Sequence, residues 1–269
     1  MSSLKDKKRV VIKLGTSTLT HKTGRLNIRR IERIVKNIAD LHNAGHEIVL
    51  VSSGAIGLGM AKLGLTEKPK ATPLKQACAA VGQCELMYFY DKLFSDYSLN
   101  VAQMLLTKYV LLEGRKENVQ NALEELLSYN VIPIVNENDT VAIDELELEV
   151  GENDSLAAIV ATLARADLLI IMSDIDGLYD SDPRQDPSAK LIPVVYGITE
   201  DIRRLAGGAG SKLGTGGMIT KINAAEIANN NGIDMIIVNG RDPDTIYDIF
   251  DEDERPGTLF VAGKNNKED

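Results

Sequence analysis

Two lysines, Lys13 and Lys221, lie beside glycines at points where the chain is expected to turn. Lys13 is near the end of the apolar run 9–14, and Gly15 permits a tight turn directly after it. A lysine there points into a ligand-binding crevice or extends to solvent from the strand end, and this segment alone favours neither. Lys221 follows a stretch rich in glycine, with the hydroxyl of Thr220 beside it, as a helical pattern begins.

Two glycine-rich segments carry groups that can hold an anion. In the first, Ser53 follows an apolar run, and Gly54, Gly57 and Gly59 are spaced for a loop that feeds a helix. Hydroxyls of this loop and backbone N–H groups at the helix start could bind phosphate or carboxylate. An ordinary turn, with glycines only relieving steric clashes, explains the same pattern. The second segment, 214–221, is not a P-loop, and no complete G-x-G-x-x-G occurs. P-loop kinases are therefore excluded, and a dinucleotide-binding dehydrogenase is disfavoured.

Four polar side chains follow the apolar run 131–135, namely Asn136, Glu137, Asn138 and Asp139. One such residue would be a common turn residue, but four in succession at a predicted strand end suggest a binding site. A free amino acid needs a carboxylate for its ammonium group and hydroxyl or amide donors for its own carboxylate. These residues, with Ser53, can supply both.

Two further segments place polar residues beside predicted elements. In Gly151-Glu152-Asn153-Asp154, capping of the following helix accounts for one of Asn153 and Asp154 but not for both. In the segment that begins Ser173-Asp174, carboxylates follow an apolar run. It resembles a calcium loop only superficially, because the later acidic ligands of an EF-hand are missing. A loop flanking a nucleotide is the better interpretation.

The elements that would position these residues alternate between short strands and helices. Apolar runs too short for helices occupy 9–14, 47–51, 101–106, 131–135, 168–172 and 235–238, and helical patterns separate several of them. This alternation predicts a mostly parallel sheet covered by helices on both faces, a three-layer αβα sandwich. Ligands of such sheets bind beyond the carboxyl ends of the strands. Because no linker divides the chain, one domain with two lobes is expected.

Composition limits the partners. The 269 residues carry a formal charge of −9, which argues against a general nucleic-acid binder, and no apolar run is long enough for a membrane span. The charged start breaks its apolar run at Lys13, too soon for a signal peptide, so a cytoplasmic protein is expected. Only Cys78 and Cys84 are present, at a spacing that matches no metal or redox motif.

Taken together, these segments resemble the glutamate 5-kinase family of the amino-acid kinase superfamily. The most specific pieces are Ser53-Gly54-Ala55, Asn136-Glu137-Asn138-Asp139, Gly151-Glu152-Asn153-Asp154 and Gly214-Thr215-Gly216-Gly217-Met218. The second of these points to glutamate, whereas the lysines and glycines recur across the superfamily. Position 152 is Glu where some relatives have Asp.

The resemblance implies three groups of site residues. Catalysis would depend on Lys13, Asp154 and Lys221. Glutamate would be held by Ser53, Gly54, Ala55, Asn136, Asp139 and Asn153. The nucleotide would be lined by Lys13, Ser173, Asp174, Thr215, Gly216, Gly217, Met218, Ile219, Thr220 and Lys221.

The resemblance also implies partners: ATP, Mg²⁺ and L-glutamate, with proline as a feedback inhibitor and a homo-oligomer, dimer or tetramer. An amino-acid lobe of about 1–165 and a nucleotide lobe of about 166–263 are expected. The C-terminal PUA domain that many relatives carry is not expected in this chain. Two alternatives remain: a superfamily kinase acting on aspartate, N-acetylglutamate or a nucleoside monophosphate, and a non-catalytic amino-acid sensor.

Overall fold

Eight strands form one sheet in the computed structural model of the chain, which describes residues 4–21, 23–107, 115–141, 153–207, 217–250 and 255–263. The strand order is β3-β4-β2-β1-β5-β7-β8-β6. Only the β7–β8 pair is antiparallel among these described strands, so the predicted, mostly parallel sheet is confirmed. The strands are β1 (Arg9–Leu14), β2 (Glu47–Ser52), β3 (Asn100–Leu106), β4 (Val131–Glu137), β5 (Leu168–Ser173), β6 (Val194–Tyr196), β7 (Asp234–Asn239) and β8 (Thr258–Val261).

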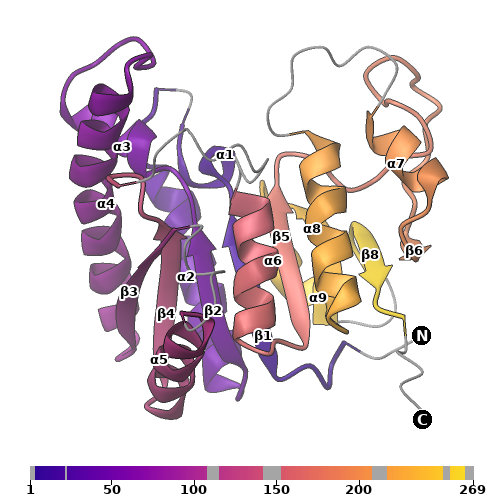
Figure 1. Ribbon diagram of the computed structural model, residues 1–269, viewed down its shortest axis with the longest axis horizontal. Coiled ribbons are helices and arrows are strands. Elements are labelled where there is room, and N and C mark those ends of the chain that lie inside the picture. Colours follow the sequence, from indigo (N-terminus) through magenta and orange to yellow (C-terminus); the bar gives the residue numbers. More distant parts are fainter. Residues whose placement is uncertain are drawn as a thin grey trace.

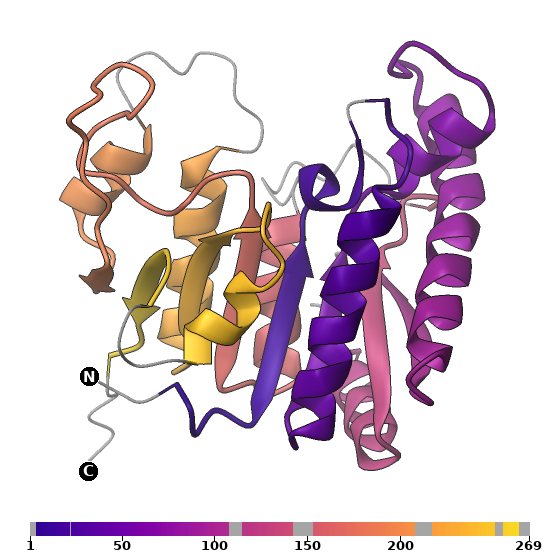
Figure 2. The same ribbon diagram turned by 180° about the vertical axis from the view of Figure 1, so that it is seen from behind.

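Helices cover both faces of the sheet, which confirms the three-layer αβα sandwich. Figure 1 shows α6 and α8 side by side in front of the sheet, with α5 beside them. From behind, Figure 2 shows α2 lying over the sheet with α9 further along the same face. The helices are α1 (Thr16–Leu19), α2 (Ile28–Asn43), α3 (Ala55–Lys62), α4 (Thr72–Ser95), α5 (Lys116–Ser128), α6 (Asn153–Leu163), α7 (Glu200–Gly207), α8 (Met218–Asn230) and α9 (Thr245–Phe250).

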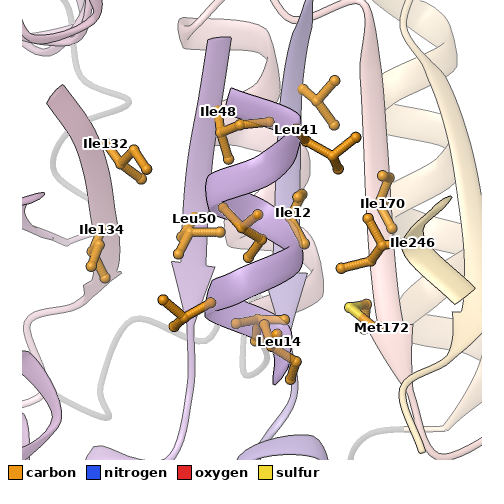
Figure 3. Close-up of a cluster of buried hydrophobic side chains, with 14 of the residues drawn as sticks. Ile12, Leu14, Leu41, Ile48, Leu50, Ile132, Ile134, Ile170, Met172 and Ile246 are labelled. Atoms are coloured by element: carbon orange, nitrogen blue, oxygen red, sulfur yellow. The ribbon is translucent and has the colours of Figure 1, made fainter. Parts of the chain in front are cut away.

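Alternate residues of each central strand enter different hydrophobic cores. Ile12 of β1 and Leu50 of β2 pack under α2, and Figure 3 shows them between that helix and the sheet. Val11 points the other way, into the core beneath α6 and α8. Because side chains along a strand alternate with a period of two, Lys13 lies on the same face as Val11. The strand therefore directs Lys13 toward α6 and α8.

Helices α3 and α4 pack unusually closely through glycine. A Cβ atom on Gly82 would lie 1.7 Å from the carbonyl oxygen of Ala55, and one on Gly59 would lie 1.8 Å from that of Cys78. The prediction that the glycines after Ser53 all belong to a loop is wrong, because Gly57 and Gly59 lie inside α3. Only Gly54 has the expected turn role, with φ 96° immediately before the helix.

Replacing Gly82 with alanine should destabilise the protein by about 1–3 kcal/mol, because the added methyl group forces α4 away from Ala55. Gly57→Ala is the matched control, since a Cβ there meets nothing within 4 Å. It should stabilise by about 0.5–1 kcal/mol, the helix-interior difference between the two residues. Urea unfolding of both variants measures this, and equal stabilities would contradict the close packing.

Candidate functional site

Lys13, Asp154 and Lys221 form one buried ionic cluster. The Nζ atom of Lys13 lies 2.7 Å from Oδ1 of Asp154, and Nζ of Lys221 lies 3.0 Å from Oδ2. The hydroxyl of Thr220 also donates to Oδ2, at 3.1 Å. The three residues come from β1, α6 and α8, and the fold brings them together.

Burial makes this cluster electrostatically strong. Asp154 is 0% exposed, and Lys13 and Lys221 are 8% and 5% exposed. Burial alone would raise the pKa of Asp154, but the two lysine charges outweigh it and hold that pKa below its ordinary value. The cluster thus contains two ammonium groups against one carboxylate, and its local excess of positive charge suits an anionic ligand.

The first turn of α6 explains why both Asn153 and Asp154 are polar. Asp154 lies in that turn, yet its carboxylate is occupied by the lysines rather than by a cap. Asn153 uses its amide nitrogen to join three partners at the ends of β2 and β4. That nitrogen donates to the carbonyl oxygen of Ser52 at 2.8 Å, to the hydroxyl of Ser53 at 2.8 Å and to Oδ1 of Asn136 at 3.1 Å.

Asn136 lies within β4 rather than after it. The strand extends to Glu137, two residues beyond the predicted end, so the expectation that all four polar residues follow the strand is wrong for the first two. The β3 register, in which Leu105 and Leu106 face Asn136 and Glu137, explains this extension. As a result Asn136 is fixed by the sheet and only 2% exposed, whereas Asp139 lies beyond the strand end.

Asp139 is a half-buried carboxylate that forms no hydrogen bond or ion pair within the described part of the chain. Burial raises its pKa above the ordinary value. A desolvated and unpaired carboxylate costs free energy in its charged form. A cationic partner would offset this cost, so the position of Asp139 suits the binding of a cationic group.

The turn from Ser53 to Ala55 presents backbone donors. Gly54 in the left-handed conformation precedes α3, and no side chain of the described residues caps that helix. The first N–H groups of α3 therefore have no intrahelical acceptor. They and the Ser53 hydroxyl provide donors beside Asn153.

The predicted nucleotide residues are placed only in part. Ser173 ends β5, and its hydroxyl donates to the exposed Asp174 at 3.2 Å. Gly217 precedes α8, and its carbonyl oxygen lies 2.9 Å from the Thr220 hydroxyl, whose single hydrogen it shares with Asp154. The helix then continues through Met218 and Ile219. Among the predicted site residues, Thr215 and Gly216 lie outside the described residues, as does the motif residue Glu152.

A layer behind these residues was not predicted. On α4, Gln83 accepts through Oε1 from Nδ2 of Asn136 at 2.8 Å. The hydroxyls of Tyr90 and Ser52 are 2.9 Å apart, and burial raises the pKa of Tyr90. The one signal available in the sequence was a polar Gln83 within an otherwise small and apolar helical stretch.

The described residues contain neither a cluster of metal-ligating side chains nor a helix that could cross a membrane. No group of three or more His, Cys, Asp or Glu side chains there is arranged to hold a metal ion. Within the same residues, each helix is too short or too polar to cross a membrane.

Known proteins with similar sequences and folds match nearly the whole chain. Residues 8–239 match the amino acid kinase family. The chain is 55% identical to glutamate 5-kinase of Clostridium perfringens (strain 13 / Type A) over 265 residues, 97% of this chain and 98% of that protein. It is 54% identical to glutamate 5-kinase of Clostridium acetobutylicum over 254 residues, 94% of each.

Structural similarity supports the fold assignment. The crystal structure of UMP kinase from Ureaplasma parvum superimposes with a TM-score of 0.64 at 15% identity, covering 95% of this chain and 99% of that one. This likeness confirms the predicted amino-acid kinase fold. The sequence matches confirm the resemblance drawn from the motifs: the chain belongs to the amino acid kinase family and groups with its glutamate 5-kinases.

Proposed function

We propose that the protein transfers the γ-phosphate of ATP to the γ-carboxylate of L-glutamate and forms L-glutamyl 5-phosphate, the first step of proline biosynthesis. The observation that carries this proposal is the Lys13–Asp154–Lys221 cluster, beside which Asn153 joins Ser53 to Asn136. The glutamate 5-kinases of the two Clostridium species support the choice of acceptor.

The reaction needs charge stabilisation more than it needs a base. A glutamate side chain has a reference pKa of about 4.3, so at neutral pH the acceptor is already an anionic nucleophile. The obstacle is to bring that anion against the phosphates of ATP. Lys13 and Lys221 supply two positive charges to the transferring group, and Asp154 orients both of them. Mg²⁺ would neutralise further phosphate charge. It commonly binds through phosphates and one or two carboxylates, so a dedicated protein cage is not required.

Recognition of glutamate follows from the unpaired groups. Asp139 would accept from the substrate ammonium group, and its own pKa would then return toward the ordinary range. The Ser53 hydroxyl, which already accepts from Asn153, keeps its hydrogen for the substrate carboxylate. The N–H groups at Gly54 and Ala55 would complete the carboxylate site, and Ser173, Asp174 and residues 215–221 would contact the nucleotide.

The remaining features of the proposal concern the whole protein. An N-terminal lobe of about 1–165 would bind mainly glutamate, and a C-terminal lobe of about 166–263 mainly ATP. The protein would act in the cytoplasm as a homo-oligomer. Proline, which presents the same α-carboxylate and a cationic nitrogen, would compete for the glutamate groups.

Trapping the product tests the proposal. The purified protein, ATP, Mg²⁺ and hydroxylamine should yield a hydroxamate with L-glutamate, because hydroxylamine captures an acyl phosphate. D-glutamate, L-aspartate, N-acetyl-L-glutamate and UMP serve as alternative acceptors, with ADP formation followed in parallel. Hydroxamate with L-aspartate or N-acetyl-L-glutamate but not with L-glutamate, or UMP-dependent ADP formation alone, would assign a different acceptor. No turnover with any acceptor would contradict the assignment as an enzyme.

Asp139→Ala should raise the KM for glutamate by about 10- to 100-fold, the loss expected for a hydrogen bond to a charged group. The KM for ATP should stay within twofold. Because burial raises the pKa of Asp139, its charge opposes folding at neutral pH, so the variant should be at least as stable as the parent protein. Asp91→Ala, at an exposed position of α4, is the control. An unaltered glutamate KM removes Asp139 from the pocket.

A further inference from the structure

Gln83 on α4 carries a buried amide nitrogen that has no hydrogen-bond partner among the residues that the structure describes. The residue is 8% exposed, and its Nε2 atom is among the buried atoms left unpaired. The other end of the same amide is engaged, because Oε1 accepts from Nδ2 of Asn136 at 2.8 Å. An unpaired buried donor is unfavourable, so the position is not optimised for the stability of the resting protein.

A backbone group that can act in only one way identifies which end of this amide is oxygen and which is nitrogen. The N–H of Glu137 must donate, and it donates to Oδ1 of Asn136 at 2.9 Å. The Nδ2 of Asn136 therefore faces Gln83, which must answer with its oxygen. Turning the Gln83 amide over would place two NH₂ groups against each other, so Nε2 stays unpaired.

The same logic identifies the oxygen and the nitrogen of the Asn153 amide. The carbonyl oxygen of Ser52 can only accept, so the contact at 2.8 Å identifies the group facing it as Nδ2 of Asn153. This NH₂ group also reaches Ser53 and Asn136. The Oδ1 of Asn153 is left without a hydrogen bond in the part of the chain that the structure describes, and the Ser53 hydroxyl keeps its hydrogen. One acceptor and one donor are thus presented together, as an amino acid requires.

We propose that Gln83 is a positioning residue of the amino-acid pocket. It holds Asn136 in the orientation that in turn holds Asn153 and Ser53, and it contributes to glutamate affinity without touching glutamate. This inference rests on the proposed function. The close approach of Gly82 to Ala55 locks α4 at the distance that the Gln83–Asn136 bond needs.

A positioning role and a packing role predict different results for Gln83→Met. This substitution keeps the length of the side chain and removes the oxygen and the nitrogen of its amide. We expect the KM for glutamate to rise about tenfold, the equivalent of one net hydrogen bond. The KM for ATP and kcat should stay within twofold. The Tm should change little, because the substitution removes the unpaired Nε2 of Gln83 but leaves Nδ2 of Asn136 without its acceptor, so one unpaired buried donor replaces another. Gln103→Met, at an exposed position on β3, is the matched control and should change none of these values.

The outcomes separate the two roles. An unchanged glutamate KM overturns the proposal, as does a fall in Tm with kcat and both KM values worsening together. A double-mutant cycle with Asn136→Ala adds a second criterion. If Gln83 acts through Asn136, the effect of Gln83→Met on the glutamate KM should vanish in the Asn136→Ala background, and a full tenfold effect there would contradict the mechanism. The parent protein is assayed first for hydroxamate with L-glutamate, so that failure of the proposed function is recognised separately.

Discussion

Lys13→Ala should lower kcat by about 10²- to 10³-fold, the loss seen when one preorganised electrostatic donor is removed from a transition state. Lys13 is only 8% exposed, and its Nζ atom lies 2.7 Å from Oδ1 of Asp154. Among the described lysines, only Lys221 shares that carboxylate. The KM for glutamate should change little, because Asp139 and Ser53 belong to separate elements. Steady-state kinetics with saturating ATP and Mg²⁺ measure the effect.

A control variant and a check of folding show whether the loss of kcat is specific to Lys13. Lys36→Ala removes an exposed lysine from α2, on the opposite face of the sheet, and should leave kcat unchanged. The Lys13→Ala protein should remain folded, since Asp154 keeps Lys221 as its partner. Undiminished turnover in a folded Lys13→Ala protein would remove Lys13 from the catalytic machinery.

Asp154→Asn should destabilise the protein by about 3–5 kcal/mol, because it leaves two buried ammonium groups without a counter-ion. The substitution preserves shape, so the loss reports charge rather than packing. Asp182→Asn is the control, since it removes an ion pair with the exposed Arg184 at the surface and should have little effect. Urea unfolding at pH 7 measures both variants.

The dependence of this effect on pH has a defined sign. The lysines lower the folded-state pKa of Asp154 below the reference value of 3.8. Its stabilisation is therefore complete above the unfolded-state pKa and is lost as pH falls through the lower folded-state pKa. The stability difference between the parent protein and Asp154→Asn should shrink below about pH 4. A difference that stays constant down to acid unfolding would show that the carboxylate charge is not what stabilises the cluster.

Most of the sheet was predictable because its central strands are buried on both faces. Such strands appear as continuous apolar runs, and all six predicted runs are strands in the structure. Strands β6 and β8 were not predicted. They have three and four residues, and β8 begins directly after Gly257, whose φ of 75° belongs to a turn. Their pairing with each other and with β7 depends on contacts distant in sequence.

The residues of the candidate site also differ in whether the sequence could predict them. Lys13, Asp154 and Lys221 stand in recognisable motifs, so their association was expected. Gln83 could not be identified, because apolar residues occur on every side of α4 in the sequence, so helical spacing marks no single inward face. The glycines of α3 were wrongly predicted to form a loop, because glycine usually indicates a turn. In the structure, the close approach of α4 is what requires Gly59.

The position of β1 has a consequence for synthesis on the ribosome. The first strand to be made lies in the middle of the sheet, between β2 and β5, and its partnership with β5 joins Val10 to Leu168. Contacts so distant in sequence must wait for chain that has not yet been translated. Of the three charged groups of the cluster, Lys13 is made first and Lys221 last. A nascent chain released before α8 emerges would hold Lys13 and Asp154 without the second cation, so phosphoryl transfer can appear only near the end of translation.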